Sequence, residues 1–182
     1  MPTKKKIWLF ETERLSVRRF TSTDDQAFFR INGNPEVVRY IRPAKTKEES
    51  DLFLQENINL YRNGSTVGRF AVFEKGTEDF AGTFSFLYLS GQEEQHIGYA
   101  MVPEAWGKGY ATELVCKGII HFFEQTTKTV LFAITSSANH ASQRVLLKSG
   151  MQNRGQVFEH GEMLDLFSIT REEWLSAYIP AQ

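Results

Sequence analysis

Two patterns of apolar residues divide this chain into candidate strands and helices. In seven short segments, β-branched and aromatic residues either alternate with polar ones or run together between clusters of turn residues, which is typical of strands. The predicted strands span residues 15–19, 67–73, 80–89, 96–102, 129–135, 151–158 and 162–169. The three middle strands follow one another across short turns and predict an antiparallel meander, and the last two predict a hairpin.

Helical spacing marks the remaining segments. The clearest pattern begins after Trp106, where apolar residues recur every three or four positions along one face of a helix of about four turns: Ala111, Leu114, Val115, Gly118, Ile119 and Phe122. Shorter patterns predict helices at 25–31, 47–63 and 139–149. Gly150 follows the last of them, where a left-handed residue commonly ends a helix. The predicted fold class is α+β, with one mixed, mostly antiparallel sheet flanked by helices.

Composition favours one packed domain over all 182 residues. Hydrophobic residues make up 41% of the chain and charged residues 24%, which excludes a largely disordered protein. The net charge of −1 argues against a nucleic-acid-binding protein. The single cysteine, Cys116, cannot form an internal disulfide, and no apolar stretch approaches the roughly 18 residues of a membrane span. We therefore expect a cytoplasmic monomer or homodimer with no membrane or nucleic-acid partner.

The densest chemical signal is at residues 99–112, where a predicted strand passes through a glycine-containing loop into a helix. Gly107 and Gly109 permit close backbone approach, and the first N–H groups of a helix have no acceptor within it, so the loop is expected to bind an anion such as phosphate. A Walker loop is excluded because Gly109, and not Ser or Thr, follows Lys108. The dinucleotide fingerprint fails because Thr112 stands at its last position. A loop that serves only as a turn is the alternative.

Residues 106–113, Trp-Gly-Lys-Gly-Tyr-Ala-Thr-Glu, resemble the acetyl-CoA pyrophosphate loop of the GNAT N-acetyltransferase superfamily. The general pattern is Gln/Arg-x-x-Gly-x-Gly/Ala, and Trp106 in its first position is typical of the ribosomal-protein N-terminal (alpha-amino) acetyltransferase-like branch. Further motifs of that branch are Glu-Thr-Glu-Arg-Leu at 11–15, Asn-Pro-Glu-Val at 34–37, Ile-Gly-Tyr at 97–99, Asn139 with Ser142, and Lys-Ser-Gly-Met at 148–151. The resemblance covers about residues 11–170. Residues 1–10 are therefore expected to be an N-terminal extension of a single GNAT domain.

This resemblance implies acetyl-CoA as co-substrate. The loop would bind its pyrophosphate through backbone amides, with added charge from the lysine: Gly107, Lys108, Gly109, Tyr110, Ala111 and Thr112. The strand ending near Met101 and Val102 would splay from its neighbour to admit the pantetheine arm, and one of these two N–H groups would polarise the thioester carbonyl. Asn139 would hydrogen-bond the arm, and it also suits the start of a helix.

Acetyl transfer needs a neutral amine and a proton for the departing thiolate. Many GNAT enzymes supply that proton from a Tyr seven residues after the Asn, but this chain has Leu146 there, so Ser142 is the candidate acid and cofactor contact. A Ser that only satisfies backbone groups at the start of the helix is equally consistent with the sequence. His96 stands where relatives commonly carry a Glu and is the candidate base, because imidazole titrates near neutral pH. A structural histidine is the alternative, with Glu93 or Glu94 as substitute bases.

The function implied is N-acetyl transfer by direct attack in a ternary complex, with the N-terminal α-amino group of a protein, such as a ribosomal protein, as the favoured acceptor. The alternatives are a small amine (an amino acid, a polyamine or an antibiotic) and a CoA-binding module without catalysis. We expect the acceptor pocket between residues 33–42 and the final hairpin, where Glu162 and Asp165 would attract an amine. No metal site is predicted, since the other histidines have no partner acids or cysteines in sequence.

Overall fold

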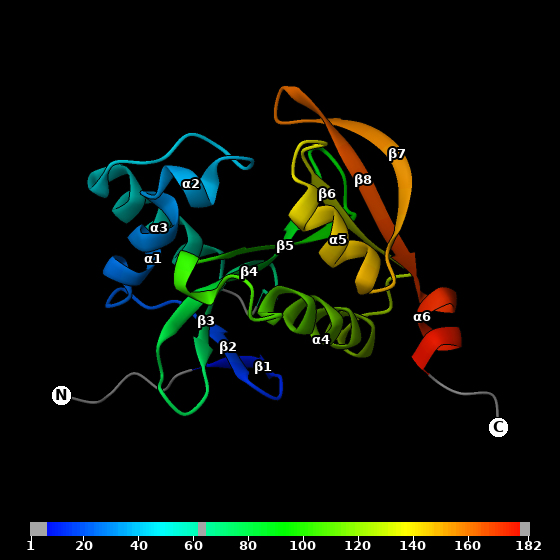
Figure 1. The fold of residues 1–182 in the computed structure, drawn as a ribbon, viewed down its shortest axis with the longest axis horizontal. Helices are drawn as coiled ribbons and strands as arrows, with labels where there is room; N and C mark the ends of the chain where they lie inside the picture. Colours follow the sequence, from blue (N-terminus) through cyan, green and yellow to red (C-terminus); the bar gives the residue numbers. More distant parts are fainter. Residues whose placement is uncertain (1–6, 62–64, 179–182) are drawn as a thin grey trace.

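The computed structural model describes residues 7–61 and 65–178 (Figure 1). Eight strands form one sheet in the order β1-β2-β3-β4-β5-β6-β8-β7, and all neighbours are antiparallel except β5 and β6. The strands are β1 (Trp8–Glu11), β2 (Leu15–Arg19), β3 (Gly68–Glu74), β4 (Phe80–Tyr88), β5 (Gln95–Met101), β6 (Val130–Thr135), β7 (Gln152–Glu159) and β8 (Glu162–Thr170). The helices are α1 (Asp25–Asn32), α2 (Pro35–Val38), α3 (Lys47–Leu60), α4 (Tyr110–Gln125), α5 (His140–Lys148) and α6 (Arg171–Tyr178), with a 3-10 turn at Pro103–Ala105. The predicted α+β class is confirmed.

Helices cover both faces of the sheet. Helix α4 packs on the face that carries Phe84 and Ile97, and Gly118 permits this close approach because a Cβ there would lie 2.6 Å from the Phe84 ring. Helix α3 packs on the opposite face, where the ring of Phe53 meets the guanidinium group of Arg69. In Figure 1, α1–α3 gather at one end of the molecule and α5 with β6–β8 at the other, and β5 runs between the two groups. None of the helices in the described ranges has both the length and the apolarity to cross a bilayer.

Strands β5 and β6 part from each other along their length. Within the described residues they are joined by one pair, His96 with Phe132, near the start of β5. On its other side β5 stays paired with β4 to its end, where Gly82 faces Met101. The sheet is therefore open between the last part of β5 and β6, as expected for the central splayed pair.

Three short elements were absent from the sequence prediction. Strand β1 replaces part of the expected N-terminal extension, and its Phe10 is buried edge-on against Phe84 with ring centroids 5.1 Å apart. Helix α2 follows the turn residues that were expected only to end α1, and Asn34 caps it by accepting the N–H of Glu36. Helix α6 extends the fold past residue 170, where Trp174 stacks on Phe123. Elements of four to eight residues show no clear periodicity, so tertiary contacts decide them.

Boundaries of the predicted elements shift by only a few residues. Gly150 has a φ of +86°, as expected for the residue that ends α5. Helix α3 ends at Leu60, and the Asn63–Gly64 stop that the sequence suggested lies outside the described residues.

Candidate active site

The glycine loop between β5 and α4 leaves the first turn of α4 open. Gly109 precedes the helix with a φ of +78° and has no side chain to cap it. Since Glu113 makes the first backbone bond to the Gly109 carbonyl, the N–H groups of Tyr110, Ala111 and Thr112 have no acceptor within the helix. These amides and the positive end of the helix dipole form an anion-binding end.

Arg14 holds this loop in place from the turn before β2. Its Nη1 donates to the Lys108 carbonyl at 2.9 Å, and its Nε donates to Glu113 at 2.7 Å. Burial raises the pKa of Glu113, but hydrogen bonds from Thr12 and Arg14 outweigh it and hold that pKa below its ordinary value. This role of Arg14 was not predicted from the sequence, because its contacts join positions 94 and 99 residues apart. The place of Arg14 in the Glu-Thr-Glu-Arg-Leu motif was the available signal.

Lys108 has its charge paired with a carboxylate of the same chain. Its Nζ lies 2.9 Å from Glu74, and both groups are near the surface. A Cβ on Gly109 would lie 3.6 Å from the Arg14 guanidinium. Arg14 is thus a second cation beside the open helix end. Lys108 would have to leave Glu74 before it bound a phosphate, and breaking such an exposed ion pair costs little free energy.

The backbone amide of Met101 points into the opening between β5 and β6. Val102 donates its N–H to the Ala81 carbonyl at 3.0 Å, so Val102 and Ala81 are a hydrogen-bonded pair of the two antiparallel strands. The next pair, Gly82 with Met101, is non-bonded, and Met101 directs its N–H and C=O away from β4. The indole of Trp106 donates to the Met101 carbonyl at 2.8 Å. The sequence suggested the N–H of Met101 or of Val102 as the group that polarises the thioester carbonyl. The N–H of Val102 is already bonded to Ala81, whereas that of Met101 is directed toward the opening.

Two hydroxyl groups meet beside the same opening. Tyr99 lies two residues before Met101 on the same face of β5, and its Oη is 3.0 Å from Oγ of Ser142 on α5. Burial raises the pKa of Tyr99 to about 12, so the phenol stays protonated at neutral pH and can donate. Asn139 caps α5 by accepting the N–H of Ser142 at 3.1 Å, and Leu146 is buried in the core. In the sequence Tyr99 stood out only as part of a motif, although its spacing from Met101 indicated a shared face.

His96 lies on the other face of β5 and five residues before Met101, about 17 Å along an extended strand. Burial lowers its pKa to about 4, so the imidazole is neutral at pH 7. Its Nδ1 is buried and has no hydrogen-bond partner within the part of the chain that the structure describes. A base with so low a pKa matches an amine poorly. Glu93 and Glu94 are exposed in the turn before β5, further still from Met101.

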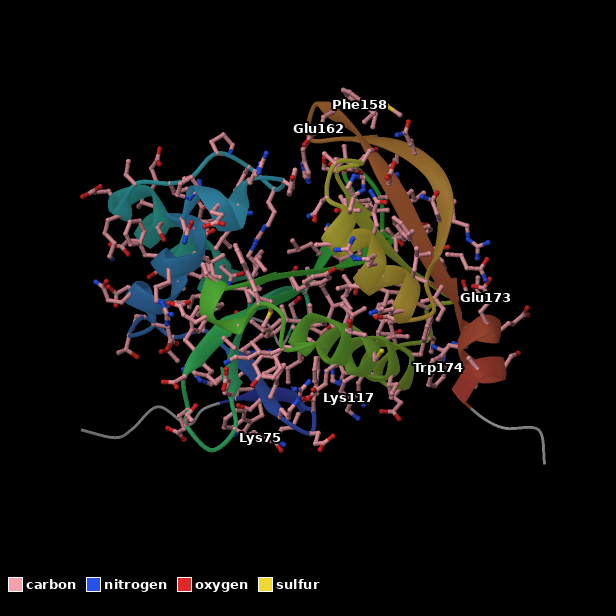
Figure 2. The ribbon with its side chains drawn as sticks, viewed as in Figure 1. Lys75, Lys117, Phe158, Glu162, Glu173 and Trp174 are labelled. Atoms are coloured by element: carbon pink, nitrogen blue, oxygen red, sulfur yellow. The ribbon has the colours of Figure 1, made fainter. Side chains whose placement is uncertain are left out.

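A cavity of about 460 Å³ lies between the segment around α2 and the start of β8. Arg39 and Arg42 line one side, and Ser136 and Glu162 line the other. Figure 2 shows Glu162 at the hairpin end of β8. The cavity therefore joins the two parts of the chain between which the sequence analysis expected an acceptor pocket.

The second carboxylate expected to attract an amine, Asp165, is engaged elsewhere. It accepts hydrogen bonds from three side chains, those of Ser137, Gln143 and Gln156. Glu162 is the carboxylate that lines the cavity. In residues 7–61 and 65–178, no cluster of three or more His, Cys, Asp or Glu side chains is arranged to hold a metal ion.

Comparison with known proteins decides the family. The model of the acetyltransferase (GNAT) domain matches residues 14–152. The chain belongs to the GNAT acetyltransferase family. It is 31% identical over 150 residues to the uncharacterized N-acetyltransferase YoaA of Bacillus subtilis (strain 168), covering 81% of this chain and 84% of YoaA. GNAT enzymes use acetyl-CoA as co-substrate, so this protein is an acetyl-CoA-dependent N-acetyltransferase.

Two solved structures show the same fold. A GNAT-family acetyltransferase from Bacillus anthracis aligns with a TM-score of 0.76 at 25% identity, over 92% of this chain and 99% of the other. RimL, a ribosomal L7/L12 alpha-N-protein acetyltransferase solved with coenzyme A, aligns with a TM-score of 0.75 at 16% identity, over 90% and 97%.

Proposed function

We propose that this acetyltransferase modifies an α-amino group, most directly the N-terminal amine of a protein such as a ribosomal protein. The main support for this proposal is that the candidate base, His96, lies on the face of β5 opposite Met101, where burial lowers its pKa to about 4. An α-amino group has a pKa near 8 and is partly neutral at pH 7, whereas a lysine or polyamine amine, with a pKa above 10, needs a stronger base. The resemblance of the 106–113 loop to ribosomal-protein acetyltransferases supports a protein N-terminus.

In this proposal the backbone does most of the positioning. The amides of residues 107–112 hold the pyrophosphate, and Arg14 keeps the loop that carries them in place. Asn139, at the start of α5, is within the wall along which the pantetheine arm would run. The Met101 N–H donates to the thioester oxygen as negative charge develops on it, which stabilises the transition state.

Proton movement completes the reaction. The amine attacks the acetyl carbon, the C–S bond breaks, and the electron pair leaves on sulfur. Ser142 donates its proton to this thiolate, and Tyr99, 3.0 Å away, either orients the hydroxyl or passes it a proton that solvent then returns to the phenol. The surplus proton on the amine passes to solvent.

A peptide assay tests the acceptor. We expect release of CoA thiol with a peptide that has a free N-terminus and a blocked lysine, and much less with its N-acetylated counterpart carrying a free lysine. The reverse preference would exclude the α-amino assignment. Binding of CoA by calorimetry without any acetyl transfer to peptides, amino acids, polyamines or aminoglycosides would indicate a CoA-binding module.

A small α-amino compound is the second candidate acceptor. It satisfies the same pKa argument, and a cavity of about 460 Å³ is within the range of small-molecule sites. An amino acid acetylated faster than any peptide would decide in its favour.

A further inference from the structure

Three cationic side chains converge on one aromatic ring at the inner side of α3. The Arg69 guanidinium lies 4.6 Å from the centroid of the Phe53 ring, that of Arg42 lies 5.2 Å away, and the Lys45 ammonium lies 5.1 Å away. Contacts with an aromatic face stabilise such charges only in part. Like charges repel one another, and the charge of Arg42 lowers the pKa of Arg69, so the arrangement needs compensation.

No carboxylate supplies that compensation within the described residues. Among the described residues, Arg42, Lys45 and Arg69 have no acidic partner within ion-pair distance. The acid whose charge acts on Arg69 is Glu56, which is exposed on α3. Burial and the charge of Arg42 lower the pKa of Arg69 to about 10. Elsewhere in the fold, a buried arginine is fully paired: Arg18 makes two hydrogen bonds of 2.8 Å to Asp24.

Hydrogen bonds leave these arginines incomplete as well. Arg42 donates from one terminal nitrogen to Asn32, but its buried Nε has no partner in the described part of the chain. Arg69 has no side-chain hydrogen bond to any described residue. A guanidinium group has five N–H donors, and leaving the buried Nε of Arg42 unpaired costs free energy. Arginines so placed are typical of sites that await an anion.

Arg42 and Arg69 connect the cavity to one face of the sheet. Arg42 lines the cavity of about 460 Å³. Arg69 faces Ser85 in the β3–β4 ladder, and Ser85 faces Gly98 on β5, so all three lie on one face of the sheet. This is the face opposite Tyr99 and Met101. Arg69 thus lies on the face of the sheet away from the proposed acetyl-CoA site, with β4 between its own strand and β5.

We propose that Arg42 and Arg69 bind a carboxylate of the acceptor, so that the substrate is an amine with a carboxylate nearby. This inference rests on the proposed acetylation of an α-amine and adds the chemical group that selects the acceptor. The carboxylate source is either an acidic side chain near a peptide N-terminus or the α-carboxylate of an amino acid. Bidentate contact with guanidinium groups is the geometry that distinguishes a carboxylate from an amide.

Matched acceptor pairs test the proposal. The peptides Ala-Glu-Ala-amide and Ala-Gln-Ala-amide differ only in a carboxylate, and so do alanine and alaninamide. Each rate is divided by the fraction of the acceptor whose amine is neutral at the assay pH, so that a difference in amine pKa does not affect the comparison. We expect kcat/KM to be tenfold to a hundredfold higher for the carboxylate member of one pair, the scale of about one charged hydrogen-bonded contact. The pair that discriminates identifies the source. Equal rates within both pairs would overturn the proposal while leaving the acetylation of an α-amine intact.

Variants tie the discrimination to the arginines. Arg69→Gln and Arg42→Gln should remove the preference by slowing only the carboxylate acceptor, with the affinity for CoA unchanged. Arg154→Gln is the matched control, because it removes the same charge from β7 at the far edge of the sheet. A preference that survives in both Arg42→Gln and Arg69→Gln would show that these arginines do not bind the carboxylate.

A binding readout separates this proposal from the failure of catalysis. Succinate should raise the melting temperature of the wild-type protein above that in sodium chloride of equal ionic strength, by mass action on the folded state. The double variant Arg42→Gln, Arg69→Gln should lose this rise. If no acceptor is acetylated but succinate stabilises only the wild type, the proposed function fails and the anion site stands. If succinate stabilises neither protein and no pair discriminates, the anion site is wrong.

Discussion

The phenol oxygen of Tyr99 lies 3.0 Å from the hydroxyl oxygen of Ser142, which links β5 to the first turn of α5 across the opening of the sheet. Neither group is charged at neutral pH, since burial raises the pKa of Tyr99 to about 12. The pair can therefore supply a proton to a thiolate without holding a charge in the resting enzyme.

Replacing Ser142 tests this role. Ser142→Ala should lower kcat by about 10²-fold to 10⁴-fold while the Kd for acetyl-CoA stays within a few-fold, because only an interaction of the transition state is lost. Steady-state kinetics with calorimetry measure both. Tyr99→Phe is the companion variant and should cost less turnover. The opposite order of effects would make Tyr99 the acid and Ser142 its positioning residue.

The glycine loop gives a prediction about co-substrate affinity. Gly109→Glu should abolish CoA binding, because a Cβ and a carboxylate would enter the open end of α4 and repel phosphate. Gly91→Glu is a control with similar backbone strain, since Gly91 has a φ of +68° in the turn before β5 and open space around it. Calorimetry should find CoA binding in the control only. Normal binding in folded Gly109→Glu would remove this loop from the site.

His96 makes stability depend on pH. Its pKa is about 4 when folded and about 6.5 when unfolded, so the unfolded state takes up the proton first as pH falls. This contribution to stability is full above pH 6.5 and is lost toward pH 4, by about 3 kcal/mol in total. His96→Gln should flatten that part of the pH profile in denaturant unfolding, whereas His140→Gln on the exposed side of α5 should not. Identical profiles for wild type and His96→Gln would contradict the buried, neutral imidazole.

The same variant bears on catalysis. If His96 were the base, His96→Gln would alter the acidic limb of the turnover profile; we expect that limb to follow the acceptor amine and to stay in place. A shifted limb would restore His96 as the base that the sequence suggested.

The buried pair of Arg18 with Asp24 should matter for folding alone. Its side chains are only 8% and 10% exposed, and Asp24→Asn leaves the guanidinium without its carboxylate, at a cost of about 3–5 kcal/mol in the free energy of unfolding. Asp25→Asn, next in sequence but exposed and paired with Lys47, is the control and should unfold like the wild type. Urea titrations compare them. Equal midpoints for both variants would show that the buried pair contributes nothing.

The sequence by itself determined the order of the main strands and helices, because hydrophobic periodicity is local. It also predicted the open end of α4 after Gly109, since glycine spacing and an open helix end follow from neighbouring residues. Local capping was predictable for the same reason, and Asn139 caps α5 as expected.

Only the tertiary structure decided which groups meet. The registers of β4 and β5 settled that Val102 has its amide occupied while Met101 turns its own toward the opening. Burial moved the pKa of His96 to about 4, and packing brought Arg14 to Lys108 and Arg42 to Arg69. A strand pattern does not reveal its register, and a pKa depends on solvent excluded by distant segments, so these properties arise from contacts between residues far apart in the chain.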